Sequence, residues 1–135
     1  MIGSPSLRRS LILTAAAFGS VLAIHAPANA ADARACFFAN NLSNWTYADE
    51  HTLYLRVGVS DIYQLKLLAA CPDLRSVEHI GIETRGGSSN ICSGLDVTVL
   101  APRSESDTGQ THCMATDLRK LSREEAKALP AKVRP

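Results

Sequence analysis

The stretch HTLYLRVGVSDIYQLKLLAACPDL, residues 51–74, decides the fold. It contains two runs in which apolar and polar side chains alternate, as they do on a strand that is buried mainly on one face. The apolar positions are Leu53, Leu55, Val57, Tyr63, Leu65 and Leu67. Residues 58–61 lie between the runs and supply Gly and Asp, which favour turns. The stretch therefore predicts a β-hairpin that ends at Cys71.

The first thirty residues have the organisation of a secretory signal peptide. Arg8 and Arg9 form a positive region, residues 11–24 an apolar region, and residues 28–30 (Ala-Asn-Ala) a cleavage site with small residues at its first and third positions. The apolar run is shorter than the roughly 20 residues of a membrane-spanning helix. We therefore expect cleavage after residue 30 and export to the periplasm or the medium. The pair of arginines leaves the twin-arginine route open beside general secretion.

Cleavage leaves residues 31–135, which is the length of a single domain. Loss of Arg8 and Arg9 reduces the 14 basic residues to 12, against 13 acidic residues. This balance lacks the positive excess that nucleic acids attract. We expect no nucleic-acid partner, no membrane span after cleavage, and a solvated face for the basic residues of positions 119–134.

The mature part contains four cysteines, which predict two disulfides in a small exported domain. Their spacings contain no CxxC pair of the kind that zinc ribbons and thiol oxidoreductases use. Four cysteines allow three pairings, and the sequence does not choose among them. The pairing we favour joins neighbouring elements through Cys71 and Cys92, and the first strand to the last through Cys36 and Cys113.

Further strands and one short helix are predicted around the hairpin. We expect an edge strand from residue 36, a loop over residues 39–49, strands over 77–84, 91–100 and 111–118, and a loop over 101–110. Ser122 and Glu125 form a capping box, which begins a short helix that should end near Leu129, before Pro130.

Candidate catalytic and metal-binding residues are scattered. Ser93 and Asp96 leave open a small envelope hydrolase, and an unpaired cysteine would allow a thiol-dependent enzyme. His79 and His112 leave open a metal-binding module, although their spacing matches no compact metal motif. No cofactor fingerprint is present, so we expect no cofactor.

Three side chains are candidates for a binding surface. Trp45 offers aromatic area, although a tryptophan there also suits a lid over the core. Arg56 lies on the outward face of the hairpin, and Arg85 precedes the Gly86-Gly87 turn. Either the Trp45 region or the Gly86-Gly87 loop could bind a protein or a small ligand.

The sequence also resembles a family of small exported proteobacterial four-cysteine proteins of unknown function. The shared features are Cys36-Phe37, residues 53–58 (LYLRVG), Tyr63-x-Leu65, Cys71-Pro72-x-Leu74, Ile91-Cys92-Ser93, Asp96, Cys113, residues 121–125 (LSREE), Leu129-Pro130 and Arg134-Pro135. The resemblance implies a periplasmic setting and treats the four cysteines as a set. It implies no activity, substrate or catalytic residue.

Together these features predict a mainly β domain. We expect a small antiparallel sheet or open barrel of five to six strands, one short C-terminal helix and two disulfides. The leading functional hypothesis is a non-enzymatic envelope protein, either a binding protein or a structural one. A hydrolase, a thiol-dependent enzyme and a metal-binding module remain as alternative hypotheses.

Overall fold

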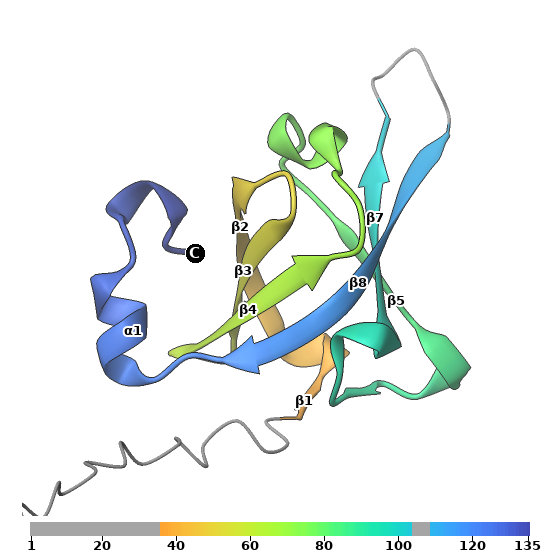
Figure 1. The fold of residues 1–135 in the computed structure, drawn as a ribbon. Coiled ribbons are helices and arrows are strands. Elements are labelled where there is room, and N and C mark those ends of the chain that lie inside the picture. Colours follow the sequence, from red (N-terminus) through yellow and green to blue (C-terminus); the bar gives the residue numbers. More distant parts are fainter. Residues whose placement is uncertain (1–35, 104–108) are drawn as a thin grey trace, which may run out of the picture.

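The computed structural model describes residues 36–103 and 109–135, so the expected signal peptide, residues 1–30, lies outside the described residues. Six strands form one antiparallel sheet in the order β2-β3-β4-β8-β7-β5, and β1 and β6 form a separate two-stranded ladder. Figure 1 shows the large sheet curled on itself, with the short helix α1 beside one end. The predicted fold class is confirmed.

The elements follow the chain in a simple order. The strands are β1 (Phe37–Phe38), β2 (Leu42–Asp49), β3 (Thr52–Val57), β4 (Asp61–Leu67), β5 (Gly81–Thr84), β6 (Asn90–Ile91), β7 (Val97–Pro102) and β8 (Gln110–Lys120). The helix is α1 (Arg123–Ala128), and the 3-10 turns are η2 (Ala39–Asn41), η3 (Pro72–Arg75), η4 (Arg85–Gly87), η5 (Gly94–Asp96) and η6 (Ala131–Val133).

The hairpin of β3 and β4 is confirmed and forms the middle of the core. Leu53 pairs with Leu65, and Leu55 pairs with Tyr63. All four side chains are buried, because the alternating apolar residues of both strands point to the same concave face. The connection is one residue shorter than expected, since Asp61 already belongs to β4.

Three segments differ from their sequence-based prediction. Of residues 77–84, where a strand was expected, only Gly81–Thr84 form one, which is β5. Residues 42–49 form the edge strand β2, although we expected a loop there. Pairing with β3 overrides the local turn preference of the asparagines, and the side chains are exposed or half-buried, so no clear alternation marks the strand. Residues 91–100 do not form one strand, because η5 separates β6 from β7.

The favoured disulfide pairing is wrong. The structure joins Cys36 to Cys92 and Cys71 to Cys113. In the antiparallel β1–β6 ladder Phe37 pairs with Ile91. Cys36 precedes Phe37 and Cys92 follows Ile91, so the two cysteines lie next to each other. The first strand therefore pairs with β6 and not with the last strand. Cys71 follows the hairpin and lies against β8, where Cys113 points into the core.

Strand β8 joins the two halves of the large sheet. Its C-terminal part pairs with β4, as in Leu65 with Leu118, and its N-terminal part pairs with β7, as in Val99 with Cys113. The turn η5 crosses it so closely that a Cβ atom at Gly94 would lie 2.6 Å from the backbone carbon atoms of Asp117. Only glycine fits at this crossing without a shift of the backbone.

We predict that Gly94→Ala lowers the free energy of unfolding by about 1–3 kcal/mol, the usual cost of overpacking. The clash is with backbone atoms, which cannot rotate away as a side chain can. Chemical denaturation measures the effect. Leu95→Ala in the same turn is the control, because Leu95 is 58% exposed and should change stability by no more than about 0.5 kcal/mol. Equal stability of the Gly94 variant and the wild type would contradict the close crossing.

The disulfide of Cys71 and Cys113 encloses a sequence separation of 42 residues and is buried in the core. On the chain-entropy model, replacing both cysteines with alanine should lower the free energy of unfolding by about 4 kcal/mol. The thermal midpoint of the whole domain should fall, because the bridge connects the end of the hairpin to β8. A thermal midpoint that does not change would show that the sheet holds this connection without the bridge.

Candidate functional site

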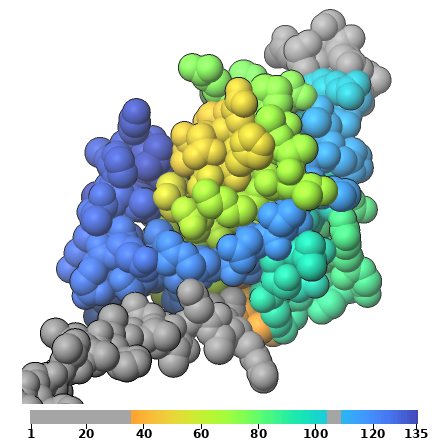
Figure 2. All heavy atoms as spheres, in the orientation of Figure 1, coloured from red at the N-terminus to blue at the C-terminus, as the bar shows by residue number. Residues whose placement is uncertain are grey.

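A cleft of about 790 Å³ lies between the tip of the β3–β4 hairpin, the end of β8 and the C-terminal segment. In Figure 2 the C-terminal segment, in dark blue, stands beside the hairpin, in yellow and green. Five basic residues and one carboxylate, that of Asp61, line the cleft. The basic residues are Arg56, Lys120, Arg123, Lys127 and Arg134. The cleft therefore carries a positive formal charge.

One of the five basic side chains is neutralised. The Lys120 ammonium donates to the Asp61 carboxylate at 2.7 Å and lies 5.8 Å from the ring centroid of Tyr63. The hydrogen bond to Asp61 raises the pKa of Lys120, and burial raises the pKa of Tyr63. At neutral pH this group is an ion pair at the edge of the cleft.

Two arginines position the C-terminal segment and keep further N–H donors unused. Arg56 donates to the backbone carbonyl of Pro135, and Arg134 donates to the carbonyls of Lys127 and Leu129 at 2.7 Å each. A guanidinium has five N–H donors, so these contacts use only part of its capacity. No Asp or Glu side chain among the residues that the structure describes pairs with either arginine.

The other two basic residues, Arg123 and Lys127, come from α1. They are four residues apart, which places them one turn apart on the same face of a helix. Within residues 36–103 and 109–135, neither side chain has a hydrogen-bond or ion-pair partner. Both residues lie on the solvated face predicted for positions 119–134, and this face borders the cleft.

The predicted capping box holds the start of α1 in place. Ser122 Oγ accepts from the Glu125 amide at 3.2 Å, and a Glu125 carboxylate oxygen accepts from the Ser122 amide at 2.7 Å. Arg119 donates to the other oxygen at 2.7 Å. The backbone hydrogen bond from Ser122, followed by the contact with Arg119, lowers the pKa of Glu125. The helix thus starts at a defined point, which positions Arg123 at the cleft.

The structure does not bring together the three residues proposed as a binding surface. Arg56 lines the cleft. Trp45 is half-buried against the core and borders a second, shallower hollow of about 320 Å³, beside Arg75 and Glu78. Arg85 lies after β5, at the opposite edge of the sheet order, and donates to Met114 Sδ at 3.1 Å. The Gly86-Gly87 turn lines neither hollow.

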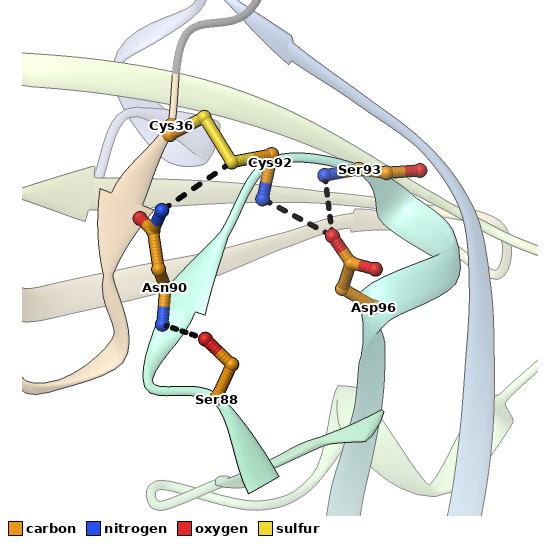
Figure 3. The surroundings of a disulfide bond; sticks show 6 residues. All are labelled: Cys36, Ser88, Asn90, Cys92, Ser93 and Asp96. Carbon is orange, nitrogen blue, oxygen red and sulfur yellow. Dashed lines mark hydrogen bonds between the residues drawn. A yellow bond between two sulfur atoms is a disulfide. The ribbon is translucent and has the colours of Figure 1, made fainter. Parts of the chain in front are cut away.

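Ser93 and Asp96 are engaged in local structure (Figure 3). Asp96 accepts from the amides of Cys92 and Ser93 at 3.2 and 3.0 Å, and Ser93 Oγ accepts from the Leu95 amide at 3.2 Å. The two side chains cap η5. The Ser93 hydroxyl therefore serves as a helix cap in this structure.

The thiol and metal readings gain no support from the geometry. All four cysteines lie in the described ranges, and each is part of a disulfide. His112 lies 3.8 Å from Glu83, and both side chains are about 60% exposed. In the part of the chain that the structure describes, no three His, Cys, Asp or Glu side chains are grouped to hold a metal ion.

Across residues 36–103 and 109–135, no helix has the length and apolar character required to span a bilayer.

Stability should depend on the charge of Glu125. Its lowered pKa means that the carboxylate stabilises the fold above its ordinary pKa, and that this contribution disappears as the pH falls through the lowered value. Glu125→Gln should therefore be less stable than the wild type at neutral pH, and the difference should shrink in acid. Thermal unfolding over a pH series measures this, with Glu124→Gln on the same turn as the control. A difference that is independent of pH would contradict the cap.

Comparison with known proteins identifies the family of the chain. Residues 7–134 match the model of DUF6491, a family of unknown function, and the chain belongs to this family. No curated protein and no solved structure matches the chain. The match supports the resemblance to a family without an assigned activity, and it supplies no ligand, partner or catalytic residue.

Proposed function

We propose that this member of the DUF6491 family is a non-enzymatic binding protein of the periplasm or the extracellular medium, and that it holds a small anionic ligand in the cleft beside α1. The observation that carries the proposal is the excess of basic side chains in the cleft. Lys120 is paired with Asp61, whereas the four other basic residues that line the cleft have no Asp or Glu side chain as a partner among the described residues.

The types of side chain indicate the chemistry of the ligand. Arginine presents a planar set of donors that matches a carboxylate or a phosphate, and lysine adds a mobile positive charge. Arg123 and Lys127 lie one helical turn apart and have no internal partner, so a single anionic group could engage both. Arg56 approaches from the hairpin side of the cleft.

The cleft also has an apolar part. Ile62 and Leu121, each 7% exposed, lie at its base, and Val59 at the hairpin tip is 94% exposed. A volume of about 790 Å³ falls within the roughly 300–1,000 Å³ of small-molecule sites. An anion with a small apolar group, such as an aryl phosphate or an aryl carboxylate, fits this combination better than a bare inorganic ion does.

Two separate observations support the proposed location. Two disulfides persist in oxidising compartments and are rare in the cytosol. The expected signal peptide over residues 1–30 leads to the same compartment. The side chains that line the cleft supply mainly positive charge and apolar contact, which favours binding over catalysis.

Titration calorimetry with phenyl phosphate at low ionic strength tests the proposal. Arg123→Glu and Lys127→Glu, made singly, should each weaken binding by about tenfold, because each removes a charge-assisted hydrogen bond and adds a repulsive charge. Lys132→Glu is the matched control: it makes the same change of charge on the C-terminal segment but does not line the cleft. Its affinity should stay close to that of the wild type.

Two further ligands separate the parts of the site. Phenol, which lacks the anion, should not bind, and inorganic phosphate should bind more weakly than phenyl phosphate does. If phenyl phosphate does not bind to the wild type, or if Lys132→Glu weakens binding as much as Arg123→Glu does, the cleft is not the anion site.

A further inference from the structure

The two disulfides differ sharply in their access to solvent. Cys71 and Cys113 are 2% and 6% exposed and belong to the core. Cys36 and Cys92 are both exposed, on the outer side of the short β1–β6 ladder. A thiol must reach a sulfur atom along the S–S axis to exchange with it, so access governs which bridge reacts.

The surroundings of the exposed bridge distinguish its two sulfur atoms. The side-chain amide of Asn90 donates to Cys92 Sγ at 3.6 Å, and no such donor to Cys36 Sγ occurs among the described residues. Figure 3 shows Asn90 directed at this sulfur, whereas Asp96 approaches the backbone amide of Cys92 on the other side. A hydrogen bond to sulfur stabilises the thiolate, so Cys92 is the better leaving group of the pair.

We propose that the bridge between Cys36 and Cys92 is a thiol–disulfide exchange site, which a dithiol reductant opens while the Cys71–Cys113 bridge stays closed. One thiolate of the dithiol attacks Cys36 Sγ and forms a new S–S bond. The bond between the two cysteines breaks, and its electron pair leaves on Cys92 Sγ, which accepts the hydrogen bond from Asn90.

The second step completes the exchange. The other thiolate of the reductant attacks the mixed disulfide at the reductant's own sulfur, and Cys36 leaves as a thiolate. The two protons of the dithiol pass to Cys36 and Cys92. The protein gains two thiols, and the reductant is oxidised to a disulfide, so electrons and protons balance.

Opening of this bridge changes how the chain is held at β1. Apart from the covalent link, β1 is attached by two residue pairs with β6 and by Phe37, which packs on Tyr63 with ring centroids 4.8 Å apart. Ala39 adds one hydrogen bond to Ser89 at 2.8 Å. Reduction therefore leaves only noncovalent contacts between β1 and β6, while the large sheet keeps its own bridge.

The test is partial reduction of the intact protein with dithiothreitol under native conditions, followed by alkylation and peptide mass spectrometry. The linked peptide of Cys36 and Cys92 should be lost while the linked peptide of Cys71 and Cys113 persists. Simultaneous loss of both linked peptides, or earlier loss of the Cys71–Cys113 peptide, would overturn the proposal.

Two variants and a monothiol test whether Cys36 Sγ is attacked and Cys92 Sγ leaves. Asn90→Ala should slow the opening by about threefold, because it removes one weak hydrogen bond to the leaving sulfur. Ser88→Ala is the control, since Ser88 Oγ accepts from the backbone N–H of Asn90 and does not contact the sulfur. Brief reaction with glutathione should form the mixed disulfide on Cys36. A mixed disulfide on Cys92, or an Asn90→Ala rate equal to that of the wild type, would overturn the role given to Asn90.

Discussion

The pairing of β8 with both β4 and β7 is the constraint on which the rest of the structure depends. In the part of the chain that the structure describes, this strand alone connects β2-β3-β4 with β7-β5 in the sheet order. Its inward side chains belong to the core, Cys113 bonds to Cys71, and η5 crosses it at Gly94. Where β8 ends, the chain passes through Leu121 into the capped helix that forms one wall of the cleft.

The parts of the fold that could be predicted from sequence have local signals. The hairpin shows its alternation within residues 53–67, and α1 shows its capping box within four residues. Pairings between distant segments have no such signal. The two-residue ladder of Phe37 with Ile91 determines which cysteine meets Cys36, and nothing in either dipeptide indicates the other. β2 was missed for a related reason, because an edge strand with exposed side chains has no buried alternation.

The candidate site, too, could be predicted from the sequence only where the signal is local. Arg56 was recognised on the outward face of the hairpin, and the spacing of Arg123 and Lys127 could be read from the predicted helix. Their common cleft could not be predicted, since it depends on the place where β8 leaves the sheet and on the return of the C-terminal segment to Arg56. Trp45 and Arg85 lie on other elements, so the aromatic and glycine-rich features that stood out in the sequence are separate from the cationic cleft.

Disulfide mapping of the unreduced protein tests this account most directly, because the connectivity records which segments β8 and β6 meet. Proteolysis at mildly acidic pH prevents exchange, and mass spectrometry identifies the linked peptides. The account predicts one peptide pair that joins Cys71 to Cys113 and one that joins Cys36 to Cys92. A pair that joins Cys71 to Cys92, or Cys36 to Cys113, would contradict the placement of β8 against the end of the hairpin.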